Sequence, residues 1–263
     1  MTAETLRSAR ILVTNDDGIH APGLHALERI AHSLSDDVWT VAPETEQSAA
    51  SHSLTTRRPL RVRRFGDRRF AVDGTPTDCV LVAVNSILKE QKPVVLLSGI
   101  NHGGNLAEDV GYSGTVAAAM EGALLGLKAI AFSQLRKDDN PAEFGMAEHL
   151  APGIVEKLYH LSWSPDLLFN VNFPARSVEQ VSGIRIGRQG RRDVMVGLVE
   201  GQDPAGRPYV WIGDFGPDQS QEEGTDLAGI REGAITITPL HQNLTDEQAL
   251  VQLSEVFGEP GRA

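Results

Sequence analysis

Two adjacent carboxylates, Asp16 and Asp17, are the residues of this chain best suited to chemistry. They follow an apolar run at residues 11–13 and precede Gly18, so the pattern predicts a buried strand that ends in an acidic loop. Adjacent carboxylates without basic neighbours favour the binding of a divalent cation. Taken alone, the stretch is also typical of an Asp-Gly surface turn, because both residue types are common in turns.

Two more oxygen-bearing side chains follow later predicted strands. Ser48 lies in a polar loop over residues 44–53, after a predicted strand at 38–42, and Asn101 follows a predicted strand at 93–97. If these strands are parallel, their carboxyl ends meet at one edge of the sheet, where open α/β sheets bind ligands. Carboxylates, a hydroxyl and an amide carbonyl together suit Mg²⁺, Mn²⁺ or Ca²⁺ better than zinc. The set predicts one divalent cation and metal-assisted hydrolysis of a phosphate ester.

A glycine-rich polar stretch adds a predicted anion site. Residues 98–105 are expected to form a loop that runs on to Tyr112, and Ser113, Gly114 and Thr115 then open a helix. Free backbone amides and the positive end of the helix dipole favour anions at such a start. Each of these residues alone is common in turns, and their joint placement is what indicates a functional site.

The histidines and the missing motifs narrow the chemistry. His102 lies in the loop of Asn101, where it can contact substrate, move a proton or simply face solvent. The roles of His52 and His241 stay open, and the eight histidines show no metal-ligand spacing. The sequence contains no Gly-x-Gly triplet, no Gly-Lys pair and no Gly-x-Ser-x-Gly segment, which excludes the dinucleotide fingerprint, the P-loop and the serine nucleophile elbow.

The elements that must position these residues alternate between strands and helices. Strands are predicted at residues 11–14, 38–42, 60–65, 69–73, 93–97, 129–132 and 167–172. Helices are predicted at 22–34, at 76–89, from 113 onward and at 143–160. The helix at 76–89 has a strong start, because Thr75 is a suitable N-cap, Pro76 suits the first position and Asp78 completes a capping box. Repeated strand-loop-helix units predict an α/β fold with a Rossmann-like, mostly parallel sheet flanked by helices.

The character of the chain changes near residue 176. Short apolar segments follow at 184–186, 194–199, 209–212 and 234–238, with a last helix predicted near 245–257. Gly, Pro and acidic residues fill the segment 201–226, which we expect to form a mobile stretch or an arm between subunits. We therefore expect one domain over residues 1–263, with a catalytic core at 9–175 and a strand-rich C-terminal extension at 176–263 that carries a hairpin and a terminal helix.

Composition excludes several partner classes. A hydrophobic content of 41% supports a globular core, and a formal net charge of -11 argues against general binding to nucleic acids or anionic membranes. The apolar runs are too short to cross a bilayer, and residues 1–10 lack the apolar stretch of a signal peptide. The single Cys79 excludes an intrachain disulfide and a thiolate zinc cage. We expect a soluble, cytoplasmic protein without membrane or stable nucleic-acid partners.

Five blocks of sequence, in order, resemble the survival protein E (SurE) family. They are Asn15-Asp16-Asp17-Gly18, residues 42–55 with Ser48 and Ser51-His52-Ser53, residues 74–80, Ser98-Gly99-Ile100-Asn101 with Gly103 and Asn105, and residues 112–122. The likeness is dense over residues 10–135, and residues 235–241 resemble the C-terminal signature of that family. Gly104 departs from the family, where proline is common, and Glu44-Thr45-Glu46 replaces a more usual Asp-Arg start.

The resemblance implies a divalent-metal-dependent 5′-nucleotidase of the cytoplasm that hydrolyses nucleoside monophosphates. It also implies a Rossmann-like core and a C-terminal part that builds a homodimer or homotetramer. The metal ligands carried over to this chain are Asp16, Asp17, Ser48 and Asn101. The phosphate-side residues carried over are Asn105, Ser113, Gly114 and Thr115.

Our hypothesis is that the bound cation activates water for attack on the phosphate, and that Asp16 or Asp17 orients or deprotonates this water. Two alternatives stay open at this point. One is an aspartyl-phosphate intermediate, although dehalogenase-like phosphatases separate their two acids by one residue. The other is a regulatory protein that binds nucleotides without turnover. The sequence leaves open the preferred base, cleavage of 3′-nucleotides or polyphosphates, and the physiological metal.

Overall fold

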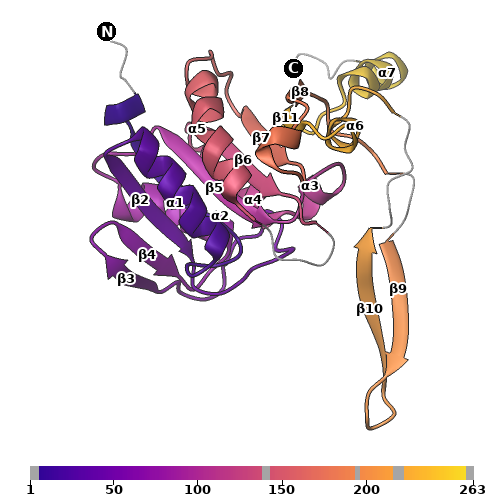
Figure 1. Ribbon diagram of the computed structural model, residues 1–263. Coiled ribbons are helices and arrows are strands. Elements are labelled where there is room, and N and C mark those ends of the chain that lie inside the picture. Colours follow the sequence, from indigo (N-terminus) through magenta and orange to yellow (C-terminus); the bar gives the residue numbers. More distant parts are fainter. Residues whose placement is uncertain (1–5, 138–142, 193–195, 216–221, 259–263) are drawn as a thin grey trace.

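A mixed sheet runs through the centre of the protein, in the strand order β3-β4-β2-β1-β5-β6-β7-β11-β8 (Figure 1). The computed structural model describes residues 6–137, 143–192, 196–215 and 222–258. The strands of this sheet are β1 (Arg10–Thr14), β2 (Asp37–Pro43), β3 (Val62–Gly66), β4 (Arg69–Val72), β5 (Val95–His102), β6 (Lys128–Gln134), β7 (Leu168–Phe173), β8 (Ile184–Ile186) and β11 (Ile235–Leu240). A separate hairpin consists of β9 (Val196–Gln202) and β10 (Pro208–Phe215).

The pairing of β1 decides where the site forms. This strand pairs in parallel with β2 on one side and with β5 on the other, and β6 and β7 continue the parallel order. Only the pairs β3 with β4 and β7 with β11 in this sheet are antiparallel within the described chain. The carboxyl ends of β1, β2 and β5 therefore lie side by side, as a ligand site of an α/β sheet requires. The predicted α/β fold with a mostly parallel sheet is confirmed.

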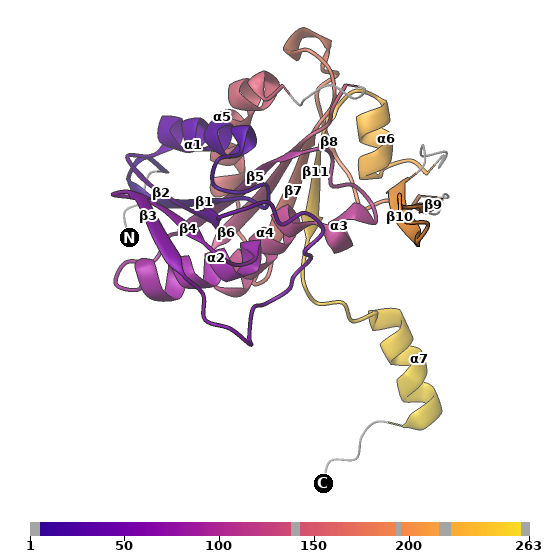
Figure 2. The ribbon, with the colours of Figure 1, turned by 90° about the horizontal axis from the view of Figure 1, so that it is seen from below.

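Helices cover both faces of the sheet (Figure 2). One face carries α1 (Pro22–Leu34) and α5 (Gly145–Tyr159), and the other carries α2 (Pro76–Val82) and α4 (Gly114–Leu124). Alternate residues of β1 serve the two layers: Ile11 and Val13 pack toward α1 and α5, whereas Leu12 packs toward α2 and α4. A strand buried on both faces is expected to read as a continuous apolar run, which is how β1 reads in the sequence.

Local sequence explains the helix starts. Thr75 caps α2 in a complete capping box with Asp78, and Pro76 takes the first helical position. Ser113 caps α4 through a hydrogen bond that its side chain accepts from the amide of Val116. The predicted helix starts at 22, 76 and 113–114 are thereby confirmed.

Two predicted boundaries are wrong. The helix expected over 76–89 leaves α-helical geometry after α2 and continues as the π-helical turn η2 (Ala83–Ile87). The loop expected from residue 98 is still strand, because β5 continues to His102. Asn101 pairs with Ser133 of β6 beyond a register shift in this ladder. The glycines indicated a loop, but pairing with a neighbouring strand supplies the backbone hydrogen bonds that keep the segment extended.

Four further short elements escaped sequence analysis because they are too short for a periodic pattern. They are α3 (Asp109–Tyr112), α6 (Asp226–Arg231), the 3₁₀ turn η3 (Val178–Gln180) and the 3₁₀ turn η1 (Leu6–Ser8), which precedes β1.

The C-terminal extension contributes to the sheet and also leaves it. β11 and β8 add to the sheet beside β7, whereas the β9–β10 hairpin projects from the body (Figure 1). The last helix, α7 (Glu247–Phe257), stands apart and buries none of its residues against the described chain (Figure 2). Parts of the segments predicted at 194–199 and 201–226 lie outside the described residues. The boundary near residue 175 stays a prediction. Among the described helices, none combines the length and apolar character needed to span a bilayer.

Gly23 allows α1 to pack closely against β5. A Cβ atom at this position would lie 2.0 Å from the carbonyl oxygen of Ile100, a backbone atom that cannot turn aside. We expect Gly23→Ala to destabilise the protein by about 1–3 kcal/mol or more through overpacking. Gly153→Ala is the matched control, because a Cβ there has open space and alanine should stabilise α5 by about 0.5–1 kcal/mol. Urea unfolding of the two variants tests this, and equal midpoints would contradict the close packing of α1 on β5.

Candidate metal and phosphate site

Asp16 is a buried carboxylate at the end of β1, with 4% of its surface exposed. The hydroxyl and the backbone amide of Thr115, in the first turn of α4, donate hydrogen bonds to it. Burial raises the pKa of Asp16 to about 6; the hydroxyl of Thr115 acts in the opposite direction, and the charge of Asp17 adds to the rise. No Lys or Arg of the described residues contributes to this pKa. Its negative charge is therefore short of a cationic partner.

The first turn of α4 comes unusually close to this carboxylate. A Cβ atom on Gly114 would lie 2.8 Å from the Cβ and 2.9 Å from Oδ2 of Asp16, so only glycine fits there. The hydroxyl of Thr115 donates its hydrogen bond to Asp16. The hydroxyl oxygen of Ser113 accepts a hydrogen bond from the amide of Val116, which leaves the hydroxyl proton of Ser113 available to another acceptor. The predicted anion cradle is thus already turned partly toward a protein carboxylate.

Asp17 lies next to Asp16 in a half-buried position. Burial is the main cause that raises its pKa, and the nearby charge of Glu46 acts in the same direction. The backbone amide of His102 donates a hydrogen bond to its carboxylate, which lowers the pKa. This contact joins the end of β1 to the end of β5, as the parallel pairing of the two strands predicts.

Asn101 stands at the end of β5, directly before the residue that contacts Asp17. Its side-chain amide donates a hydrogen bond to the carbonyl of Gly103, with 3.0 Å between nitrogen and oxygen. The amide of Gly103 donates in turn to the carbonyls of Asn101 and Gln134. Holding the Asn101 nitrogen in this turn leaves the carbonyl oxygen of its side chain as the group to offer a cation.

Ser48 is the most exposed of the four predicted ligands. Its hydroxyl donates to a carboxylate oxygen of Glu46 at 2.7 Å. The amide of the preceding Gln47 donates to the backbone carbonyl of Asp16 at 2.8 Å, which attaches the Ser48 loop to the end of β1. Glu46 was not predicted as a site residue. Its closeness to Asp17 depends on how the loops after β1 and β2 meet, which no local pattern shows.

Asn105 is buried on the other side of the site. Its backbone amide donates to Asn172 Oδ1, and its side-chain nitrogen donates to Ser133 Oγ, both at 2.8 Å. The carbonyl of Asn105 accepts from the side-chain amides of Asn170 and Asn172. β6 and β7 therefore hold Asn105 through buried polar contacts, which are worth more than the same contacts in water.

The oxygen set fits a hard divalent cation. Within the described residues, no three His, Cys, Asp or Glu side chains gather into a metal-binding group. The predicted set has only two acids, Asp16 and Asp17, and Ser48 and Asn101 would add oxygen ligands to it without adding charge. A buried carboxylate without a basic partner, as in Asp16, is stabilised by a nearby cation. The residues present can therefore hold Mg²⁺, Mn²⁺ or Ca²⁺.

A cavity of about 310 Å³ adjoins Ser113. Its walls include Ala117 and Met120 of α4, His52, and the chain that follows β11 with His241. His52 Nε2 lies 2.9 Å from an oxygen of Glu121, a contact that fixes the position of this histidine in the cavity wall. The role of His52 stays open. His52 and His241, far apart in the sequence, thus line the same space.

Comparison with known proteins finds the same family in sequence and in structure. The family described as Survival protein SurE matches residues 11–195. A protein named 5′-nucleotidase SurE from Paramagnetospirillum magneticum is 54% identical over 250 residues, which are 95% of this chain and 96% of that protein. Its namesake from Phenylobacterium zucineum is 52% identical over 95% of this chain and 97% of that protein. The crystal structure of the SurE protein from Aquifex aeolicus superposes with a TM-score of 0.82 at 38% identity, covering 94% of this chain and 99% of that one.

The raised pKa of Asp16 predicts a pH-dependent stability of the metal-free protein. Its folded-state value of about 6 exceeds its ordinary value of 3.8, so the folded state holds more protons between these values. Stability contributed by this group is therefore lost as pH rises through that window. Asp16→Asn removes the effect, and its stability relative to wild type should rise by on the order of 1–2 kcal/mol between about pH 5 and about pH 7.5.

Urea unfolding of chelator-treated protein at the two pH values measures this change. Asp67→Asn is the control, because Asp67 is an exposed carboxylate with 97% of its side chain accessible. A stability difference between Asp16→Asn and wild type that does not change with pH would contradict the assignment.

Proposed function

The chain belongs to the SurE family, and on this premise we propose that it is a divalent-metal-dependent 5′-nucleotidase that hydrolyses nucleoside 5′-monophosphates to nucleoside and phosphate. One observation supports this most directly. Parallel pairing of β1 with β2 and β5 brings together two acids that have no Lys or Arg partner among the described residues, a hydroxyl and an amide oxygen, all beside the start of α4.

Each site residue has a task in this proposal. Asp16, Asp17, Ser48 and Asn101 hold the cation, which when bound polarises the phosphate and lowers the pKa of water. Thr115 fixes the orientation of Asp16 through its two hydrogen bonds. Asp17, the more accessible of the two acids, is placed to orient or deprotonate the attacking water.

The phosphate group is assigned to the side of α4 and Asn105. The amide of Gly114 and the hydroxyl proton of Ser113 are the donors that α4 can still offer to a phosphate oxygen. Asn105 adds a polar side chain that β6 holds in place. The nucleoside is assigned to the cavity beside Ser113, whose apolar walls at Ala117 and Met120 suit a base. The base preferred there stays open.

The proposed location is the cytosol. The chain has one cysteine, Cys79, which is buried and unpaired, as is usual in a reducing compartment.

The proposed nucleotidase activity is tested by removing metal from the protein with a chelator and then restoring one metal at a time. We expect phosphate release from 5′-nucleoside monophosphates to vanish with the chelator and to reappear when Mg²⁺, Mn²⁺ or Ca²⁺ is restored singly. Asp17→Asn should lower the rate by on the order of 10² to 10⁴, because a metal ligand or base is lost. Asp67→Asn is again the matched control, since this exposed acid lies outside the site.

The same assay separates the alternatives. Label from heavy-oxygen water that enters an enzyme carboxylate in a single turnover would replace direct water attack with an aspartyl-phosphate intermediate. Folded, metal-loaded protein that binds nucleotides but releases no phosphate would instead be a regulatory binding protein.

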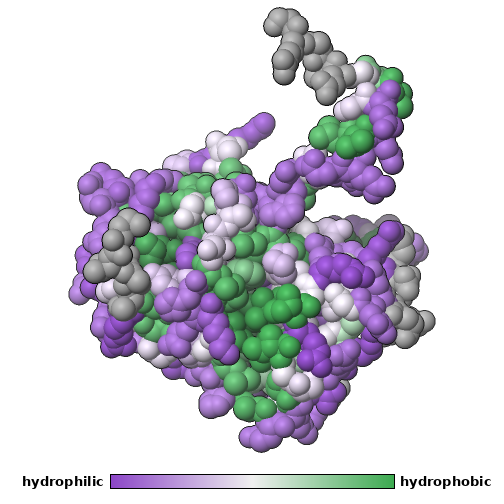
Figure 3. Space-filling view, turned by 90° about the horizontal axis from the view of Figure 1, so that it is seen from above, coloured by the Kyte–Doolittle hydropathy of each residue, from purple (hydrophilic) through white to green (hydrophobic). Residues whose placement is uncertain are grey.

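We also propose that a second copy of this chain covers the projecting parts of the extension. Figure 3 shows hydrophobic side chains on the arm that contains α7. The large apolar residues of this helix are 49–81% exposed; they are Leu250, Val251, Leu253, Val256 and Phe257. The hairpin exposes Trp211 and Ile212 by 67% and 78%. Exposed apolar surface of this extent is typical of an association site, and a homodimer or homotetramer would bury it.

Charges on α7 should break this assembly. Leu253→Lys combined with Val256→Lys places two lysines on the apolar face of the helix, and we expect the mass in solution to fall to that of a smaller assembly or a monomer. Gln252→Lys adds a lysine at a neighbouring polar position of the same helix and serves as the control. Light scattering at fixed protein concentration measures the mass, and an unchanged mass in the double variant would contradict an α7-mediated interface.

A further inference from the structure

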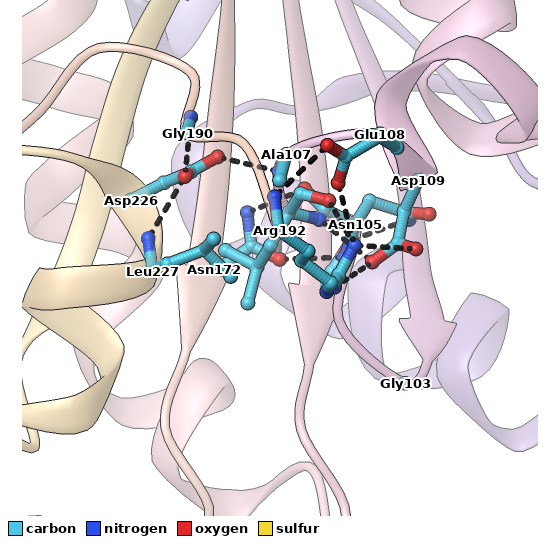
Figure 4. Close-up of polar contacts among 12 residues, drawn as sticks. Gly103, Asn105, Ala107, Glu108, Asp109, Asn172, Gly190, Arg192, Asp226 and Leu227 are labelled. Carbon is cyan, nitrogen blue, oxygen red and sulfur yellow. Dashed lines mark hydrogen bonds and ion pairs between the residues drawn. The ribbon is translucent and has the colours of Figure 1, made fainter. Parts of the chain in front are cut away.

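The loop over residues 103–112, here named the phosphate-side loop, is held from outside by the C-terminal extension (Figure 4). Asp226, the first residue of α6, is fully buried. One of its carboxylate oxygens accepts from the amide of Ala107 at 2.9 Å, and the other accepts from the amides of Gly190 and Leu227, each at 2.8 Å. A single carboxylate therefore ties the loop to two segments of the extension.

Arg192 makes a second tie on the next residues of the loop. Its guanidinium binds both carboxylate oxygens of Asp109, at 2.7 and 3.1 Å, and also donates to the carbonyl of Leu106 at 3.2 Å. The backbone amide of Arg192 donates to Glu108 at 2.9 Å. Only 11% of the arginine side chain is exposed, so this two-pronged contact is largely shielded from water. Such paired contacts impose geometry that a lysine cannot reproduce.

These ties act on the middle of the loop, between Asn105 and Ser113. Asn105 lies directly before the clamped residues, and Ala107 among them has a left-handed φ of +50°, which a residue other than glycine rarely adopts unless its surroundings hold it. Asp109 begins α3, and its carbonyl accepts from the amide of Ser113 at 2.9 Å. Movement at residues 106–109 would therefore displace Ser113 and would strain the contacts that hold Asn105 on β6 and β7.

We propose that Arg192 and Asp226 are positioning residues for phosphate binding: they fix the phosphate-side loop so that Asn105 and Ser113 face the phosphate group. The inference rests on the proposed function for the identity of the anion. The extension then completes the site in addition to any role in assembly. The cation ligands come from the ends of β1, β2 and β5, so the two positioning residues act on phosphate affinity and leave cation affinity unchanged.

Asp226→Asn removes the tie to the loop selectively. The asparagine keeps its carbonyl oxygen on the amides of Gly190 and Leu227 when its nitrogen faces Ala107, because the opposite orientation would leave two donors unpaired. Arg192→Lys is the second variant, which retains the charge and loses the two-pronged contact. Glu222→Gln is the matched control, since it removes an exposed ion pair with Arg188 in the same extension without touching the loop.

The measurement is binding of inorganic phosphate to the metal-loaded full-length protein by titration calorimetry, alongside cation binding to the stripped protein. We expect both loop variants to bind phosphate about 10-fold more weakly, because each lost tie is coupled to the phosphate-binding residues through the backbone of the same loop. Cation affinity should match wild type, and Glu222→Gln should match it in both titrations. If Asp226→Asn and Arg192→Lys fold and still bind phosphate with wild-type affinity, the ties serve stability alone. That result would overturn the proposal.

A double-mutant cycle locates the effect. If Asp226 acts through Asn105, then Asp226→Asn should change phosphate affinity far less in an Asn105→Ala background than in wild type. Fully additive losses would mean that Asp226 acts by another route, against the proposal. Failure of the proposed function looks different: wild type would bind phosphate and respond to these variants, yet release no phosphate from any nucleotide.

Discussion

The burial of one carboxylate against the first turn of one helix is the constraint on which the site depends. Asp16 sits where β1 ends, and α4 approaches it so closely that Gly114 has no room for a side chain. Hydrogen bonds from Thr115 hold the carboxylate, yet burial still raises its pKa to about 6. A charge kept in that position is stabilised by a cation. The fold thus holds a buried carboxylate that a divalent cation would stabilise, in keeping with the proposed chemistry.

The rest of the core serves to place the neighbours of this carboxylate. Parallel pairing of β1 with β2 and β5 is what brings Ser48 and Asn101 to the same edge. On the far side of β5, polar residues of β6 and β7 replace apolar ones where the strands approach Asn105. These buried polar groups are matched to one another, so they specify one position of the loop above them.

The C-terminal extension combines two kinds of surface. Its polar residues Arg192 and Asp226 face inward and contact the phosphate-side loop, whereas the apolar residues of α7 and the hairpin face solvent in the single chain. Exposed hydrophobic surface of this kind is stabilised when it is covered. If a second copy covers it, assembly and the integrity of the phosphate-side loop are linked through one segment of chain.

The sequence by itself determined the features that local physics encodes. Apolar runs marked the strands β1, β2, β5, β6 and β7, and capping residues marked the starts of α2 and α4. The acids at the end of β1 marked the edge of the sheet where we propose that the cation binds. Only the tertiary structure decided that β5 continues through Asn101, that Thr115 serves Asp16, and that Asp226 contacts Ala107, 119 residues away in the chain. Glycines and short helices carry no periodic signal, and contacts at such separation depend on strand order and loop packing, which local patterns do not specify.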